Sequence, residues 1–148
     1  MHPRRWTDQD YEAMSWHDCH VHAFRMAEGQ HGSGELEFDL DYILEWKSMK
    51  DKFSFLLVPA TLRFHEAFGL RVALDWSTPS AALGPFSLAS IERHVEVRPR
   101  YEATVWRLAV NWPTGTIEFE AKGFTQTAWG REVGSANQVL RPSERTAA

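Results

Sequence analysis

The chain has 148 residues, of which 43% are hydrophobic and 13% aromatic, with seven Trp, nine Phe and a formal net charge of −4 at pH 7. This composition excludes a disordered chain, and the length suits one domain, 1–148, with a self-sufficient core. The negative charge disfavours attraction to nucleic-acid phosphates or to an anionic membrane surface, so we expect neither as a partner.

A short helix is predicted near the N-terminus. Residues 1–13 form an N-terminal extension, and the segment from Thr7 to Met14 is predicted to be helical. Thr7 is a favourable N-cap, and the acidic residues that follow it suit the first turn of a helix.

The clearest strand runs from Glu35 to Trp46, where apolar and polar residues alternate and only Ile43 breaks the pattern. A strand of this length would extend roughly 40 Å at about 3.3 Å per residue, which is longer than usual. We therefore expect it to bend or to carry a bulge. Its acidic face consists of Glu35, Glu37, Asp39, Asp41 and Glu45.

Further strands are expected along the rest of the chain. An apolar run at 53–58 suits a central strand, which Pro59 would end or kink. Two alternating segments, 104–112 and 117–121, flank Pro113-Thr114-Gly115 and predict a hairpin. The shorter candidates are strands at 61–65, 70–76, 91–98 and 124–127, a turn at Gly69 and a loop at 77–86.

These elements favour an all-β fold, a single antiparallel sandwich or flattened barrel of about eight strands with at most one or two short helices. The C-terminal tail, 129–148, is polar and lacks periodicity. We expect its last residues to be disordered, whereas Val139 and Leu140 are apolar enough to dock. Exposed sheet edges can pair between subunits, so the sequence is compatible with a homodimer.

Residues 16–22 hold the one cluster of side chains that suggests chemistry. In an extended segment, Asp18, His20 and His22 share one face, and a His-x-His pair on a strand can converge on one ion. We therefore hypothesise a site for a divalent transition metal at these three residues. The further candidates to complete it are His17, His65, Glu92 and His94. The competing interpretation is a solvated polar face, or a side chain that hydrogen-bonds the backbone at a strand end.

Catalysis has weaker support in the sequence. Cys19 is the only cysteine, so no intrachain disulfide can form, and a reducing cytoplasm is the simplest location. In a regular strand it faces away from Asp18 and His20, and we expect a buried, inert thiol. The sequence contains no nucleophile elbow, phosphate-binding glycine loop or dinucleotide fingerprint. We accordingly expect no organic cofactor.

The acidic face of 35–46 has two interpretations. Cross-strand pairing with basic residues would neutralise it, the candidates being Arg63, Arg71, Arg107 and Lys122. If the acids are instead unpaired, they form a negative stripe that would steer and hold a basic protein partner. The stripe would consist of Glu35, Glu37, Asp39 and Asp41.

Several segments together resemble a group of small uncharacterised bacterial proteins. They are Trp16-His17-Asp18-x-x-Val21-His22 and the stretches 38–46, 59–62 and 117–124. The resemblance covers about residues 14–127 and implies no activity, cofactor or catalytic residue. It gives His17, Asp18 and His22 more weight than His20. Because His17 points away from the other two in a regular strand, a bulge would be needed to unite them.

The sequence thus predicts a non-catalytic, cytoplasmic protein-binding or regulatory module, for instance an immunity-like factor. One alternative is a metal-binding protein or small metal-dependent enzyme centred on Asp18, His20 and His22. Another is a binder of an apolar small ligand, which the seven Trp residues suggest.

Overall fold

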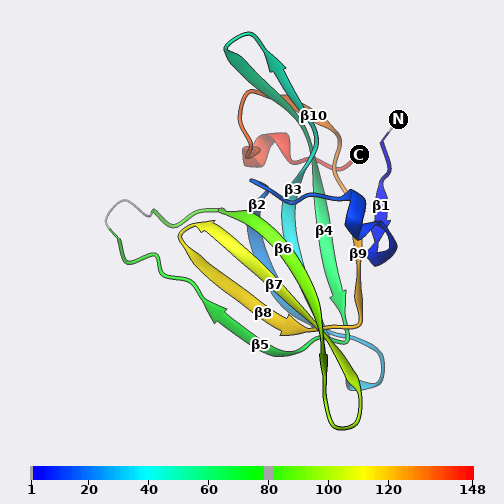
Figure 1. Cartoon of the computed structure of the whole chain (residues 1–148). Coiled ribbons are helices and arrows are strands. Elements are labelled where there is room, and N and C mark those ends of the chain that lie inside the picture. The colour runs from blue at the N-terminus through cyan, green and yellow to red at the C-terminus, as the bar shows by residue number, and fades with distance from the viewer. Residues whose placement is uncertain (1, 79–81) are drawn as a thin grey trace.

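The computed structural model describes residues 2–78 and 82–148 and shows an all-β protein (Figure 1). The strands in these ranges are β1 Arg5–Thr7, β2 His20–Glu28, β3 Gly34–Met49, β4 Lys52–His65, β5 Phe68–Ala73, β6 Phe86–Val97, β7 Glu102–Trp112, β8 Gly115–Glu120, β9 Gly123–Ala128 and β10 Val133–Ser135. Three short 3-10 helices accompany them, η1 Asp8–Ala13, η2 Gln30–Gly32 and η3 Pro142–Glu144. The predicted all-β class is confirmed. Within the described ranges no helix has both the length and the apolar character needed to cross a membrane.

All strands belong to one antiparallel sheet, in the order β1-β9-β4-β3-β2-β6-β7-β8-β5, with β10 beside β4. Its two halves meet at a seam where β2 and β6 share only two residue pairs, His20–Ser87 and Val21–Phe86. The sheet folds over at this seam, and its inner faces enclose the core (Figure 1). The sheet is not closed into a barrel, so the sandwich is the predicted alternative that forms.

Alternation along the strands builds the core. The inward face of β3 supplies the buried residues Leu36, Phe38, Leu40 and Tyr42. At the centre, the ring centroid of Phe64 lies 4.7 Å from that of Phe119 and 5.1 Å from that of Trp106. Edge-to-face contacts of this kind add to the free energy gained by burying the rings.

The long strand β3 carries the predicted bulge. Its register against β4 shifts between Ile43 and Glu45, which leaves Leu44 as the extra residue. Ile43 precedes the bulge and breaks the alternation because it packs on the outer face, against the apolar cluster of Phe55, Leu57 and Leu140. Pro59 does not end its strand as one prediction held. β4 continues through it, and the Pro59 carbonyl accepts a hydrogen bond from the Trp129 N–H at 2.9 Å.

Most short-range predictions agree with the structure. Thr7 caps η1, and the hairpin of β7 and β8 turns at Pro113-Thr114. The turn expected at Gly69 lies instead at 66–67, and Gly69 sits in β5 with φ +67° at a register irregularity. Of the predicted loop at 77–86, residues 79–81 lie outside the described residues, and the last position already belongs to β6.

The C-terminal tail is ordered to its end, so the prediction of disorder there was wrong. β10 adds to β4, and further along the Arg131 N–H donates to the Thr146 carbonyl at 3.1 Å. The predicted docking of Leu140 is confirmed, since it is buried against Phe55 and Leu57 in a second apolar cluster. The tail therefore covers part of the outer face of β3 and β4.

Candidate functional site

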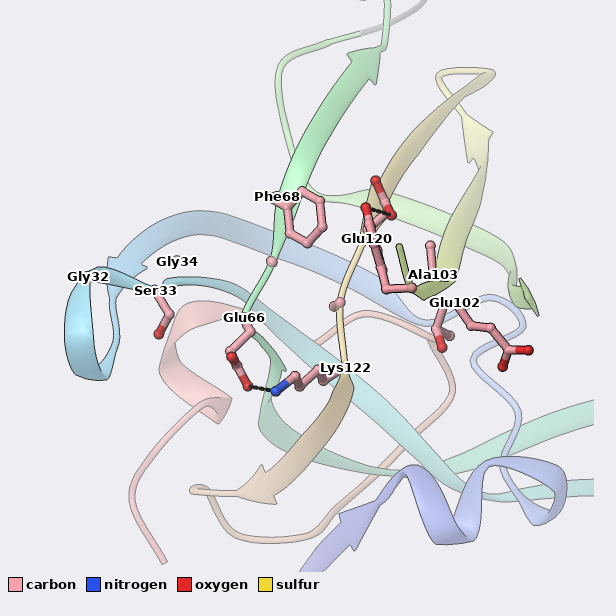
Figure 2. A pocket seen from close by; sticks show the side chains of 13 residues that line it. Gly32, Ser33, Gly34, Glu66, Phe68, Glu102, Ala103, Glu120 and Lys122 are labelled. Carbon is pink, nitrogen blue, oxygen red and sulfur yellow. Dashed lines mark hydrogen bonds and ion pairs between the residues drawn. The ribbon is translucent and has the colours of Figure 1, made fainter. Parts of the chain in front are cut away.

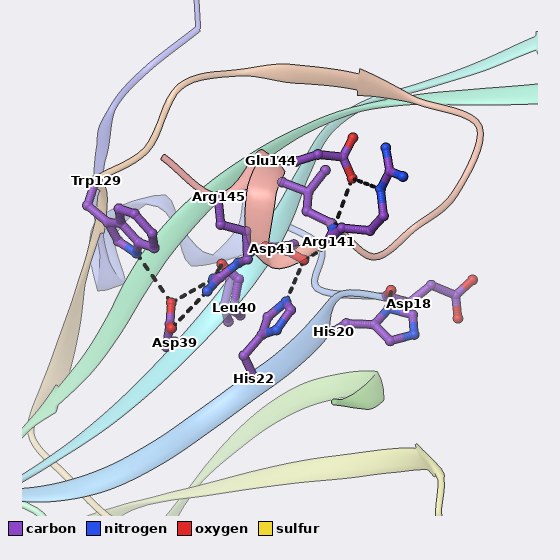
Figure 3. A network of polar contacts seen from close by, with 11 residues as sticks. Asp18, His20, His22, Asp39, Leu40, Asp41, Trp129, Arg141, Glu144 and Arg145 are labelled. Atoms are coloured by element: carbon purple, nitrogen blue, oxygen red, sulfur yellow. Dashed lines mark hydrogen bonds and ion pairs between the residues drawn. The ribbon is translucent and has the colours of Figure 1, made fainter. Parts of the chain in front are cut away.

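Asp41 lies at the centre of a polar network on the outer face of β3 (Figure 3). Strand alternation predicts a solvated side chain there, yet Asp41 is completely buried because the C-terminal tail crosses over it. The Leu140 N–H donates to its Oδ2 at 2.9 Å, and Nε2 of His22 lies 2.7 Å from the same oxygen. A carboxylate can be buried only with partners of this kind.

Arg145 supplies the positive charge of this network. Its Nε donates to Oδ1 of Asp41 at 2.8 Å, while Nη1 and Nη2 donate to the two oxygens of Asp39 at 3.0 and 2.7 Å. The guanidinium carbon lies 5.2 Å from the ring centroid of Trp129, which provides a cation–π contact. We call Asp39, Asp41, Leu140 and Arg145 the tail latch, because they join the tail to β3.

The electrostatics of the tail latch favour the charged forms. Burial raises the pKa of Asp41, but hydrogen bonds from His22, the Leu140 N–H and Arg145 outweigh burial and hold the pKa below its ordinary value. Burial lowers the pKa of Arg145, and the carboxylates of Asp39 and Asp41 more than restore it. Both groups are therefore charged at neutral pH, and their hydrogen-bonding atoms point at each other.

The pair of His22 and Asp41 has the geometry of a base with its orienting acid. His22 also lines a cavity of about 660 Å³ together with Trp76, Leu83 and Leu140. The described residues that line this cavity include no Ser, Thr, Cys or Lys that could act as a nucleophile beside the imidazole. Asp41 also accepts hydrogen bonds from Arg145 and from the Leu140 N–H, so its interaction with His22 is one of three that this carboxylate makes.

The three residues of the hypothesised metal site have separate partners. Asp18 precedes β2 in a left-handed conformation with φ 64°, and Asn111 and Gln138 donate to its carboxylate at 3.1 and 3.0 Å. His20 begins β2 and places its Nδ1 3.1 Å from the Asp18 carbonyl oxygen, which is the strand-end hydrogen bond of the competing interpretation. Burial lowers the pKa of His20. His22 is the extra residue of a bulge, between Val21 and Ala23.

The other residues proposed to complete that site also lie in contacts of their own. Nδ1 of His17 lies 3.2 Å from Asp18 Oδ2, whereas His65 bridges Glu35 and Thr125 at 2.9 and 2.8 Å. On β6 the nearest ionic partners are Arg107 for Glu92 and Glu96 for His94. In the part of the chain that the structure describes, no three His, Cys, Asp or Glu side chains are grouped to hold a metal ion.

The acidic row is paired within the chain. Arg63 lies 3.3 Å from Glu35 and 3.5 Å from Glu37, and Arg25 lies 3.1 Å from Glu37. Arg63 is the one predicted basic partner that takes this role among the ion pairs described. Asp39 and Asp41 bind Arg145 of the tail. The unpaired state on which a negative docking stripe depended is therefore not what these residues adopt.

Cys19 and the tryptophans fit ordinary packing. Cys19 is completely buried, as predicted, and burial raises the pKa of its thiol to about 12, which disfavours the reactive thiolate. Trp6, Trp16 and Trp106 are buried in the core. Core packing therefore explains part of the tryptophan content that had suggested an apolar ligand.

The free end of the β3–β4 hairpin carries a different kind of surface. Residues 46–53, which we call the hairpin tip, are all exposed, and in Figure 1 this end projects from the body of the sandwich. Trp46, Met49 and Phe53 remain 47%, 73% and 58% exposed. The ladder between β2 and β3 ends at the His20–Asp41 pair, whereas β3 and β4 stay paired to Met49–Lys52. Beyond residue 42, β3 therefore has a strand on one side only among the described residues.

Sequence reasoning missed Arg145 and the hairpin tip. No local pattern marks Arg145, because its partners lie more than 100 residues away, at 104 for Asp41 and 106 for Asp39. The sequence does contain a signal for the hairpin tip, since three Lys residues and three large apolar residues fall within the eight positions 46–53.

Comparison of the chain with protein-family models, curated proteins and solved structures found no match. Its function must therefore be inferred from its own residues and geometry. The resemblance to small bacterial proteins stays a prediction.

Proposed function

We propose that this protein is a non-catalytic module that binds a protein partner through the hairpin tip. The observation that carries the proposal is the exposure of eight consecutive residues that include three large apolar side chains. Exposed aromatic and Met side chains are costly to leave in water, and they are the residue types enriched at protein interfaces.

The charge of the hairpin tip defines the kind of partner. Residues 46–53 contain Lys47, Lys50 and Lys52 against the single acid Asp51, so three positive charges and one negative charge give +2 in a chain whose net charge is −4. A positive patch on a negative molecule favours an acidic surface and orients the encounter with it. We therefore expect a partner with an apolar centre and an acidic rim.

The arrangement of the tip favours a protein over a membrane. Lys50 and Asp51 form the turn, so two charged side chains would have to enter the bilayer first. Ser48 is paired with Phe53, and Met49 with Lys52, so apolar groups lie on both faces of the hairpin. Such a hairpin suits a partner that contacts it from two sides. The free edge of β3 can also accept an added strand.

The test is capture of a partner from a lysate of the source cells, followed by binding of the purified partner. The variant Trp46→Ser/Met49→Ser/Phe53→Ser should weaken binding by about 30-fold or more, since loss of a hot spot costs about 2 kcal/mol or more. The matched control is Met26→Ser/Val95→Ser/Val97→Ser, which removes three other exposed apolar side chains. It should bind as the wild type does.

Two results would contradict the proposal. One is a partner whose binding falls equally in both triple variants. The other is a dimer of this chain that the hairpin variant dissolves, because a second copy would then be the occupant of the surface. A cytoplasmic location and an immunity-like role are further predictions that this experiment would inform through the identity of the partner.

A further inference from the structure

A cavity of about 570 Å³ opens among loops at one end of the sandwich (Figure 2). In Figure 1 the loop between β2 and β3, which lines it, lies at the opposite end from the hairpin tip. The cavity lies where the connection from β4 to β5 and the connection from β8 to β9 approach this loop. Its volume falls within the range of roughly 300 to 1,000 Å³ that is typical of small-molecule sites. It shares no lining residue with the hairpin tip.

Small side chains make this space. Ala67, Ala103 and Ala121 line the cavity, and the last two are only 3% and 4% exposed, so they sit at core depth. Leu or Val at such positions would fill the end of the sandwich. Gly34 serves close backbone approach here, because a Cβ on it would meet the Ala67 carbonyl oxygen at 2.8 Å.

Aromatic rings flank the opening. Phe68 and Tyr101 line the cavity and remain 53% and 50% exposed, so a large part of each side chain stays uncovered. Figure 2 shows Phe68 at the cavity beside Glu120. An aromatic ring face attracts a cation as well as apolar groups.

Acidic groups outnumber basic ones around the cavity. Glu66, Glu102 and Glu120 line it together with a single base, Lys122, so the lining carries a net charge of −2. Lys122 pairs with Glu66 at 3.1 Å, and Arg98 from outside the lining lies 3.7 Å from Glu120. Tyr101 donates to Glu120 at 3.2 Å. Even with Arg98 included, one negative charge is left over.

We propose that this cavity binds a small organic cation, an ammonium group on a short apolar body. The apolar body lies between Phe68 and Tyr101, against Ala67, Ala103 and Ala121, which we call the alanine floor. The ammonium group lies at the rim, near the carboxylate of Glu120, which Figure 2 shows beside Phe68. Apolar burial supplies affinity, and the excess of carboxylates selects the positive charge.

The experiment titrates the folded protein with three probes of equal length, hexylammonium, hexanol and hexanoate, while backbone amide shifts are followed by NMR. Hexylammonium should shift the amides of residues 66–68, 101–104 and 120–122 and bind about tenfold or more tighter than hexanoate, with hexanol between them. Added salt should narrow the difference between the charged probes.

Substitutions separate the apolar floor from the charge. Ala103→Leu should fill the cavity and abolish the shifts from all three probes. Glu120→Gln should weaken hexylammonium severalfold and leave hexanol unchanged. Glu118→Gln is the matched control, because it removes the same charge from the same strand outside this cavity. If Ala103→Leu does not fold, Tyr101→Ser tests the same contact at the exposed mouth.

Three results would overturn the inference. Equal affinity for the three probes would remove the selection for charge. Absence of shifts at millimolar hexylammonium would remove the site. Shifts that persist in Ala103→Leu would place the probe elsewhere on the molecule.

Discussion

Asp41 shows how one carboxylate can connect distant parts of a chain. It lies in the alternating acidic row, where each neighbour at i±2 faces outwards, and it alone of that row is completely buried. Its two oxygens reach β2 through His22 and the tail through Leu140 and Arg145. Removal of such a carboxylate leaves the Leu140 N–H and His22 without their acceptor and leaves Arg145 with Asp39 as its one remaining carboxylate in the tail latch.

We expect Asp41→Asn to lower the free energy of unfolding by about 3 kcal/mol, the scale found when one member of a buried charge pair is removed. The amide cannot accept from Arg145, His22 and the Leu140 N–H together. Urea denaturation at pH 7 measures the change. Asp51→Asn, at the exposed hairpin turn, is the control and should unfold at the wild-type urea concentration. Equal midpoints for the two variants would mean that the latch does not stabilise the fold.

At the scale of elements, the C-terminal tail packs on the outer face of β3 and β4 and is held there by two kinds of contact. One is the polar tail latch, and the other is the apolar contact of Leu140 with Phe55 and Leu57. Both interactions bury groups on a sheet face that would otherwise meet water. The tail therefore belongs to the folded body rather than to a flexible appendage.

Leu140→Ala should lower the free energy of unfolding by about 3 kcal/mol, because it removes a buried side chain and leaves a cavity beside Leu57. Proteolysis should then begin within residues 136–148. Leu83→Ala provides the comparison, as Leu83 is largely exposed and its truncation should have little effect. Wild-type resistance to protease in Leu140→Ala would show that the tail is held without this contact.

Elements in which apolar and polar residues alternate regularly were predictable from the sequence, and elements without such alternation were not. The alternation of β3 predicted its inward face, its length predicted a bend or a bulge, and Thr7 predicted where η1 begins, because local chemistry decides all three. The tail lacks a period, and its order depends on Asp41 and Phe55, which are far from it in sequence. Local propensity contains no information about such pairs.

At the scale of the whole molecule, several carboxylates and one histidine set the dependence on pH. Hydrogen bonds and charges hold the pKa of Asp41 and Glu35 below ordinary values despite burial. Their stabilisation is thus present above about pH 4 and is lost as the pH falls through the lower folded-state values. The lowered pKa of His20 reduces stability at a higher pH than the carboxylates do. Below about pH 6.5 His20 binds a proton in the unfolded chain but not in the folded one, and this favours unfolding.

Stability should therefore fall in two steps on acidification, one below about pH 6.5 and a second below about pH 4. Urea midpoints between pH 8 and pH 2 measure this profile for the wild type and two variants. His20→Gln should flatten the first step, and Asp41→Asn should reduce the second. A His20→Gln profile parallel to that of the wild type over the first step would contradict the assignment to this residue.

The candidate site was less predictable than the fold for the same physical reason. The faces of β3 and the pairing of Arg63 with the acidic row follow from alternation and cross-strand chemistry. The separation of Asp18, His20 and His22 does not, because a left-handed residue and a bulge interrupt the extended segment that would align them. The cavity with the alanine floor depends on which strand ends meet across the sandwich.

The latch also dictates an order of events when the chain is made. Leu140 leaves the ribosome 99 residues after Asp41, which it covers. Phe55 and Leu57 of the nascent sheet are therefore exposed to solvent until Leu140 has been synthesised. During that interval this apolar patch is available to chaperones or to neighbouring chains, and the arrival of Leu140 covers it.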